Sequence, residues 1–340
     1  MAHSSTLPTI DLSAFLKQED DEDGWKKAMK DIHEACSEYG FFLAVNHGVP
    51  LQLMSQALQV SKSFFDLPDE DKLDYSLKPA AATPPIDGSS THSGSRTGII
   101  IESPQGDKFE YALRLALGAS NNKAEYVALL VEAKLALAYN DSQLVVNQVL
   151  EEMYPYFTKL GSLVENIIND CLGLPPDFLK EYNDDRSLDF IIALHYFPAT
   201  ETDNVGKACH SDGNSITFVF SDGVEGLQVY KDGEWISICP PEGTLVVNIG
   251  DIIQVLSNDK LKSAAHRVVR QLGKSRYSYA FLYTIPGDKL VEPLPHFTVN
   301  KGDSPKYKGF LYKEYVQLRV RNVTRPQDRV GIAHYEISKS

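Results

Sequence analysis

The spacing of apolar residues along the chain changes in character near residue 188. Upstream, apolar side chains recur every three to four positions over residues 25–39, 51–65 and 150–172, which predicts three helices that each bury one face. An apolar run at residues 41–49 predicts a strand between the first two helices. We therefore expect residues 1–80 to form one N-terminal region of helices and strands.

Downstream of residue 188, short β-forming runs are separated by turns. About eight strands at this spacing favour a double-sheet jelly roll over alternating strands and helices. The expected strands are residues 190–197, 215–221, 226–230, 235–239, 244–249, 253–256, 263–269 and 277–283. The predicted fold class is mainly β with flanking helices, around a double-stranded β-helix (jelly-roll) core at residues 150–320. A tail at 321–340 follows a helix expected at 312–319.

The run of residues 207–218 carries the strongest candidate chemistry. His210 and Asp212 are one residue apart among β-formers, so an extended backbone would point both side chains to one face. His266 lies in another strand-like run and could supply a third ligand. Two imidazoles and one carboxylate form the facial triad of non-haem Fe(II) oxygen chemistry. The sequence therefore predicts an iron site.

A carboxylate clamp is expected close to that site. Arg276 and Ser278 follow His266 within a later strand, and alternation places their side chains on one face. A guanidinium binds a carboxylate through two parallel hydrogen bonds, and a hydroxyl adds a further donor. A metal triad with such a clamp indicates an acidic co-substrate beside the metal.

Composition and net charge narrow the class of protein that carries this chemistry. The 340 residues are 43% hydrophobic and 23% charged, with no apolar run that could span a bilayer and no apolar leader. The net charge of -13 argues against a nucleic-acid surface, which needs a basic footprint. The four scattered cysteines predict reduced thiols, and Cys209 should face away from His210. We expect a soluble, cytoplasmic monomer that binds no nucleic acid and no membrane.

Several segments resemble the plant Fe(II)- and 2-oxoglutarate-dependent dioxygenases, the class of flavonol synthase, anthocyanidin synthase and gibberellin oxidases. They are residues 8–11 (PTID), 40–49 (GFFLAVNHGV), 64–68 (FFDLP), 226–235 (GLQVYKDGEW) and 248–251 (NIGD). The resemblance implies that His210, Asp212 and His266 hold Fe(II), and that Arg276 and Ser278 bind the distal carboxylate of 2-oxoglutarate. Dioxygen is then a co-substrate, with ascorbate as the reductant.

The resemblance also implies the reaction. Members couple the decarboxylation of 2-oxoglutarate to succinate and carbon dioxide with oxidation of an organic substrate. Related halogenases lack the carboxylate ligand and place chloride there, so the presence of Asp212 disfavours halogenation. Hydroxylation, desaturation and oxidative demethylation of a small metabolite of plant specialised or hormone metabolism stay open.

One motif departs from the family pattern. Many members have Asn-Tyr-Tyr-Pro where this chain has His195-Tyr196-Phe197-Pro198, so one co-substrate hydroxyl is absent at Phe197. His195 and Tyr196 remain candidate co-substrate contacts. Phe218 and Leu282 are candidates for the substrate pocket, because they alternate in register with Asp212 and Arg276, although core packing is the simpler role for either.

A second resemblance covers residues 84–148. The runs IDGSS at 86–90, SPQGD at 103–107, YALRL at 111–115 and ASNNKAEY at 119–126 are similar to the ribonuclease H domain of plant retrotransposon polyproteins. Asp87, Glu125 and Asp141 match three of its metal-binding carboxylates, and a helix is expected at 124–138. A central strand and the fourth acid of that family are missing here, so we expect an inactive insert, because a two-metal nuclease needs its full set of carboxylates.

Two alternatives to the dioxygenase therefore stay open at this point. One is a metal-binding pseudoenzyme or regulatory binding protein in which the insert has replaced the substrate lid. The other is a nuclease of the ribonuclease H type that uses Asp87, Glu125 and Asp141.

Overall fold

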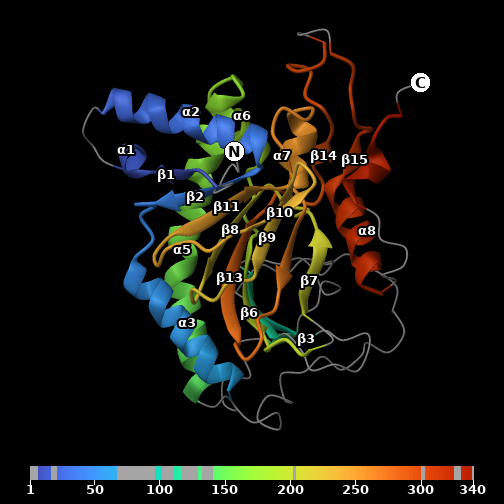
Figure 1. Cartoon of the computed structure of the whole chain (residues 1–340). Helices are drawn as coiled ribbons and strands as arrows, with labels where there is room; N and C mark the ends of the chain where they lie inside the picture. The colour runs from blue at the N-terminus through green and yellow to red at the C-terminus, as the bar shows by residue number, and fades with distance from the viewer. Residues whose placement is uncertain are drawn as a thin grey trace.

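Two β-sheets pack face to face, and helices cover the outer face of the larger sheet (Figure 1). The larger sheet has nine strands in the order β1-β2-β11-β8-β13-β6-β4-β3-β5, and the smaller has four in the order β10-β9-β12-β7. The computed structural model describes residues 7–16, 21–66, 96–101, 111–116, 129–131, 141–201, 204–299, 303–324 and 331–338. This arrangement confirms the predicted jelly roll with flanking helices.

The elements have the following bounds. The larger sheet consists of β1 (Thr9–Asp11), β2 (Phe41–Val45), β11 (Leu245–Ile249), β8 (Ile216–Ser221), β13 (Arg276–Tyr283), β6 (Phe190–Tyr196), β4 (Tyr111–Ala116), β3 (Arg96–Ile101) and β5 (Leu129–Val131). The smaller sheet consists of β10 (Glu234–Ser237), β9 (Leu227–Lys231), β12 (His266–Val269) and β7 (Val205–His210), and β14 (Leu290–Val291) pairs with β15 (Phe310–Leu311). The helices are α1 (Ser13–Leu16), α2 (Glu22–Glu38), α3 (Leu51–Phe65), α5 (Asp141–Cys171), α6 (Phe178–Tyr182), α7 (Asp251–Leu256), α8 (Tyr312–Thr324) and the 3-10 turn η5 (Ile332–Tyr335).

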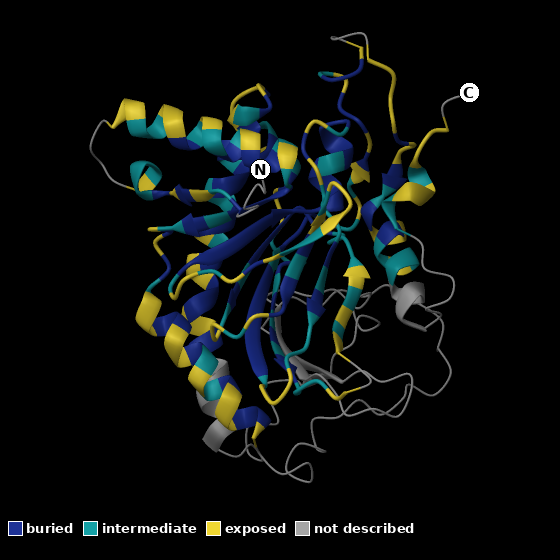
Figure 2. Cartoon of the chain, in the orientation of Figure 1, coloured by how far each residue is buried: buried dark blue, intermediate teal, exposed yellow. Residues whose placement is uncertain are grey.

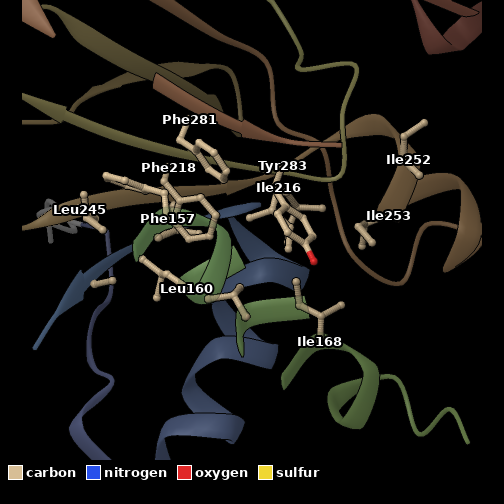
Figure 3. Close-up of a cluster of buried hydrophobic side chains, with 14 of the residues drawn as sticks. Phe157, Leu160, Ile168, Ile216, Phe218, Leu245, Ile252, Ile253, Phe281 and Tyr283 are labelled. Carbon is tan, nitrogen blue, oxygen red and sulfur yellow. The ribbon is translucent and has the colours of Figure 1, made fainter. Parts of the chain in front are cut away.

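Strict alternation along the central strands gives the larger sheet two different faces. The side chains of β13 that pack toward the helices are large and apolar, whereas Arg276 and Ser278 alternate with them and point toward the smaller sheet. Phe281 of β13 and Phe218 of β8 meet Phe157 of α5 in the helix-facing core (Figure 3). The central strands are accordingly almost entirely buried (Figure 2).

A smaller apolar cluster fills the space between the two sheets. It is formed by Leu7, Phe41, Tyr196, Leu227, Val229, Ile238, Val246 and Val268. Residues of both sheets contribute to it, which is why the two sheets hold a fixed spacing. The inward-facing polar side chains described below lie within this second layer.

The helices over residues 25–39, 51–65 and 150–172 are confirmed as α2, α3 and α5. The predicted strand at residues 253–256 is wrong, because this segment belongs to helix α7. A short apolar run does not distinguish a buried strand from a buried helix by its pattern, and every described apolar side chain of α7 is buried. Within the described ranges, no helix is both long and apolar enough to cross a lipid bilayer.

The segment expected to be a separate insert contributes strands to the larger sheet. β4 pairs with β6 through Arg114↔Ile192 and Leu115↔Ile191, and β3 pairs with β4 and β5. Within the helix predicted at residues 124–138, the structure describes 129–131, which form β5. The rest of that helix prediction lies outside the described residues.

A buried polar network joins α5 to the edge of this core. Glu165 is buried and accepts hydrogen bonds from Asn183 Nδ2 at 2.7 Å and from the Tyr283 hydroxyl at 2.9 Å. Burial raises the pKa of its carboxyl to about 7, although these two donors and the charge of Arg186 act in the opposite direction. Glu165 therefore titrates near neutral pH.

We predict that Glu165→Gln reduces the fall in the free energy of unfolding that the wild type shows as the pH rises from about 5 to about 8. In the unfolded chain the Glu165 pKa is near its ordinary value of 4.5. Between these two pKa values the Glu165 carboxyl is protonated in the folded protein and ionised in the unfolded chain. Its contribution to the free energy of unfolding is therefore complete below about pH 4.5 and is lost as the pH rises through about 7. Urea unfolding of both proteins at about pH 5 and pH 8 should show that the variant loses less stability, by up to about 3 kcal/mol.

Glu151→Gln is the control for this measurement, because Glu151 is exposed on the same helix. It should lose as much stability between the two pH values as the wild type. An equal loss in all three proteins would contradict the assignment to Glu165.

Candidate metal centre

Two histidines lie side by side in the smaller sheet. His210 ends β7 and His266 begins β12, and the antiparallel register places them directly opposite each other. Their ring centroids are 4.2 Å apart. His210 and His266 are 56 positions apart in the sequence, and sheet pairing brings the two strand ends together.

Asp212 completes the cluster from the irregular segment that follows β7. Its Oδ1 lies 3.7 Å from His210 Nε2 and 3.6 Å from His266 Nε2. The ligand atoms of the three residues all lie within 4.8 Å of one another. The sequence placed His210 and Asp212 on one extended strand, whereas the strand ends at His210 and Asp212 reaches the same point from the irregular segment after it.

The imidazole rings are oriented by the backbone. His210 Nδ1 lies 2.8 Å from the carbonyl of Ala208, and His266 Nδ1 lies 3.2 Å from the carbonyl of Ala264. Because a carbonyl only accepts, each Nδ1 carries a proton, and in the neutral form of the ring Nε2 then presents a lone pair. Phe41 of β2 packs edge-on against the His266 ring, with centroids 5.4 Å apart, and restricts its rotation.

Two neighbouring strands hold the carboxylate of Asp212. Its Oδ2 accepts hydrogen bonds from Thr217 Oγ1 of β8 at 2.7 Å and from Asn248 Nδ2 of β11 at 2.9 Å. These bonds leave Oδ1 directed at the two imidazoles. Sequence reasoning missed both donors. Asn248 lies in a family-like segment, but only sheet pairing shows that it and Thr217 reach Asp212.

The protonation states of the cluster suit a metal ligand set. Burial raises the pKa of the Asp212 carboxyl, but the charges of His266 and His210 and the two hydrogen bonds outweigh it and hold the pKa well below its usual value. Burial and the neighbouring His266 lower the pKa of His210 well below 6.5. An ionised carboxylate and a neutral imidazole are the forms that bind metal. The residues present therefore fit Fe(II).

Arg276 places a buried positive charge in the same layer. The residue is 5% exposed, its Nη1 donates to Ser278 Oγ at 2.9 Å, and its Nε donates to the Val224 carbonyl at 3.1 Å. Burial lowers the pKa of this guanidinium, with Tyr196 and Asp222 acting in the opposite direction. No described carboxylate forms an ion pair with it. A buried guanidinium of this kind is expected to receive an anion.

The clamp lies close to the metal ligands. Val268 is two residues beyond His266 on the inward face of β12, a rise of about 7 Å. A side chain at Gly226 would meet Arg276 Cδ at 3.1 Å and Val268 Cγ1 at 3.4 Å, so Val268 and Arg276 converge on this glycine. Arg276 therefore lies beside the residue that is two positions along β12 from His266.

The two further co-substrate candidates, Tyr196 and His195, lie on opposite faces of β6. Tyr196 pairs with Arg276, and its ring centre lies 5.4 Å from the guanidinium carbon. His195 instead faces the helices, where it stacks on Tyr277 at 4.4 Å and packs against Phe65. The structure therefore brings Tyr196 to the clamp and does not bring His195, because neighbouring residues of a strand point to opposite faces.

The two substrate-pocket candidates separate in the same way. Phe218 is fully buried in the helix-facing core, because the bend at residues 213–215 interrupts the alternation that was assumed from Asp212. Leu282 lies on the inward face of β13 opposite Thr217, which contacts Asp212. Leu282 therefore stays a candidate, whereas the structure does not bring Phe218 to the site.

The three nuclease candidates are not assembled in the described part of the chain. Asp87 and Glu125 lie outside the described residues, and Asp141 begins α5, where its side chain is not described. Cys209, next to His210, is exposed as a free thiol, as its position in the strand predicted.

Two family models match the chain. The model of the 2OG-Fe(II) oxygenase superfamily matches residues 188–285, which contain the metal cluster and Arg276. The model of the N-terminal region of non-haem dioxygenases in morphine synthesis matches residues 7–107. The second match continues into residues 84–107, so these comparisons give no support to a ribonuclease H segment there.

Relatives and solved structures agree with these matches. Jasmonate-induced oxygenase 1 of Arabidopsis thaliana is 32% identical over 335 residues, covering 97% of this chain and 75% of the relative. Gibberellin 20 oxidase 2 of the same plant is 30% identical, covering 92% and 77%. A crystal structure of JOX2 in complex with 2OG, Fe and JA superposes with a TM-score of 0.76 at 28% identity, covering 98% and 90%. The chain belongs to the 2OG-Fe(II) oxygenase superfamily.

Proposed function

We propose that this enzyme oxidises a small organic metabolite, with Fe(II) held by His210, Asp212 and His266 and 2-oxoglutarate held by Arg276 and Ser278. The observation that carries the proposal is the triad of two oriented imidazoles and one carboxylate, with the buried guanidinium of Arg276 in the same inter-sheet layer beside Val268. Succinate and carbon dioxide are the expected co-products.

Fe(II), when bound with 2-oxoglutarate and dioxygen, supplies the chemistry that couples decarboxylation of the co-substrate to oxidation of a substrate. His210 Nε2, His266 Nε2 and Asp212 Oδ1 would hold the metal. Arg276 would receive the distal carboxylate, and the Ser278 hydroxyl, which accepts from Arg276, would donate its own proton to the same anion.

The apolar residues between the sheets would keep water away from these charges. Val268 and Val229 are buried beside the histidines and contribute to the inter-sheet cluster. A low local dielectric strengthens the contact between Arg276 and a bound dianion. The fold therefore supports tight orientation of the co-substrate without a further charged side chain.

The names of the relatives support a plant metabolite as substrate. They include a gibberellin oxidase, a probable flavonol synthase and a flavonol synthase/flavanone 3-hydroxylase. Leu282, half-buried on the inward face, is our candidate for a substrate contact. Hydroxylation, desaturation and oxidative demethylation all fit the same metal centre, and a metabolite panel with oxygen consumption as readout would distinguish them.

We also propose that the protein acts as a cytoplasmic monomer that binds neither nucleic acid nor membranes. Its four cysteines are free thiols and its net charge is -13, which suit a reducing compartment and disfavour phosphate backbones. Size-exclusion chromatography with light scattering, and fractionation of plant cells, would test the two parts of this proposal.

We predict that the purified protein releases succinate when supplied with Fe(II), 2-oxoglutarate and oxygen, and that His210→Ala abolishes this release. The substitution removes one of three ligands, so the metal is lost or misplaced. Cys209→Ala is the matched control, because Cys209 is the exposed neighbour of His210. Succinate release that His210→Ala leaves intact would reject the metal assignment.

We predict that Arg276→Lys raises the KM for 2-oxoglutarate by about ten- to hundredfold, the effect of losing a charge-assisted hydrogen bond of roughly 1.5–3 kcal/mol. Initial rates of succinate formation against 2-oxoglutarate concentration would measure it. Arg267→Lys is the control, since Arg267 lies over the Trp235 ring at 4.0 Å and not in the clamp. Equal KM values in the two variants would contradict the role of Arg276.

We predict that Thr217→Val weakens metal binding by about tenfold while the protein stays folded. Valine has the shape of threonine but cannot donate to Asp212 Oδ2, so the carboxylate keeps only the hydrogen bond from Asn248. Isothermal titration with Fe(II) under anaerobic conditions would measure the dissociation constant. Unchanged affinity would show that Asn248 alone is sufficient to orient the ligand.

A further inference from the structure

The C-terminal helix contacts the loop that carries Asp212. α8 lies on the side of the sheets away from α3 and α5 (Figure 1). From it, Arg319 Nη2 donates to the Ser211 carbonyl at 2.6 Å and Arg319 Nη1 donates to Asp251 Oδ2 at 3.1 Å. The side chain of Asp251 is fully buried and that of Arg319 is 17% exposed. One guanidinium thus joins α8, the metal-binding loop and the start of α7.

The carboxylate of Asp251 is the centre of this junction. Its Oδ2 also accepts hydrogen bonds from the Tyr315 hydroxyl and from Ser211 Oγ, the latter at 3.2 Å. Tyr315 lies one turn before Arg319 on α8 and is fully buried, so the helix presents both groups to the same acceptor. Arg319 offsets a buried negative charge that would otherwise be costly.

The junction fixes the two peptide groups on either side of Asp212. The Ser211 carbonyl belongs to the peptide group before Asp212 and accepts from Arg319. The Asp212 carbonyl belongs to the peptide group after it and accepts from the Asp251 amide at 2.7 Å. With both planes held, the direction in which the Asp212 side chain leaves the backbone is set.

Close packing leaves this loop little freedom to shift. A side chain at Gly213 would meet Arg319 Cδ at 2.6 Å, so the glycine lets the arginine lie directly against the loop. Downstream, the Ser215 carbonyl accepts from the Gly250 amide at 2.8 Å, and the Ser215 amide donates to the Tyr283 carbonyl at 3.1 Å. The loop is thus held at both ends, and Arg319 holds the end nearest to His210.

We propose that Arg319 is a positioning residue for the iron centre, which orients Asp212 by fixing the Ser211 carbonyl against Asp251. The inference rests on the proposed function only in its assignment of His210, Asp212 and His266 as metal ligands. The described hydrogen bonds of Arg319 go to Ser211, Asp251 and Tyr315 and not to the three ligand side chains, so its effect passes through the backbone. Losing it should weaken metal binding more than it weakens the fold.

Arg319→Lys tests this inference, because a lysine keeps the positive charge beside Asp251 but cannot contact Asp251 and Ser211 in the same fork geometry. Anaerobic titration with Co(II), followed by its visible absorption, measures metal affinity without turnover. We expect the dissociation constant to rise about ten- to hundredfold. The thermal midpoint of the metal-free protein should fall no more than in the control variant described next.

Arg186→Lys is a matched control. Arg186 also joins a fully buried aspartate, Asp189, to a backbone carbonyl, with Nη1 3.6 Å from Asp189 Oδ2 and Nη2 donating to the Thr284 carbonyl at 2.9 Å. Its side chain is 24% exposed, close to the value for Arg319. We expect this variant to lose thermal stability while keeping the Co(II) affinity of the wild type.

The possible outcomes separate the inference from the proposed function. Unchanged Co(II) affinity in Arg319→Lys, with binding lost in His210→Ala, overturns the positioning role and leaves the metal centre standing. Equal loss of affinity in Arg319→Lys and Arg186→Lys also overturns it, because the effect would then be general destabilisation. Retained binding in His210→Ala overturns the metal centre itself.

Tyr315→Phe keeps the test decisive if Arg319→Lys does not fold. This variant removes one hydrogen bond from Asp251 and leaves Arg319 in place. We expect a smaller loss of Co(II) affinity in the same direction. An affinity equal to that of the wild type would overturn the role of the Asp251 junction in positioning the metal-binding loop.

Discussion

The metal centre depends on the apolar packing of the larger sheet against α3 and α5. Phe218, Phe281 and their neighbours can satisfy that core only if they face the helices, and alternation then turns Thr217, Ser278 and Arg276 toward the smaller sheet. A shift of one residue in any of these strands would exchange the two faces and bury the wrong set. The helix-facing core therefore decides which polar groups reach the site, although it touches none of the ligand atoms.

The inter-sheet layer holds one negative charge, on Asp212, and one positive charge, on Arg276. The described residues do not fully compensate either charge. Asp212 is ionised and receives two hydrogen bonds, and Arg276 is buried with no carboxylate partner among the described residues. Burying such groups is costly unless they are paired. A divalent cation on one and a dicarboxylate on the other would balance both, which gives the same layer a physical reason to bind the metal and the co-substrate together.

Elements far apart in the chain share the task of orienting one carboxylate. Asp212 receives hydrogen bonds from β8 and β11, and its loop is held by the start of α7 and by Arg319 of α8. Phe41, from the N-terminal part of the chain, restricts the ring of His266. Such outer contacts commonly tune metal affinity by an order of magnitude or more. Five elements that are distant in the sequence, β2, β8, β11, α7 and α8, therefore support a site with three ligands.

The sequence by itself determined the jelly-roll class, three of the main helices, the triad of His210, Asp212 and His266, and the clamp candidate Arg276, because period, residue chemistry and order along the chain are local properties. It could not identify Thr217, Asn248 or Arg319, since their roles arise only when strands and helices distant in sequence meet. Pattern alone misjudged two local features: α7, for which the apolar run did not distinguish strand from helix, and the facing of Phe218. His195, a candidate from its place in the family motif, faces the helices instead of the clamp. Tertiary structure decided these points because a bend resets the alternation and sheet pairing selects which face is buried.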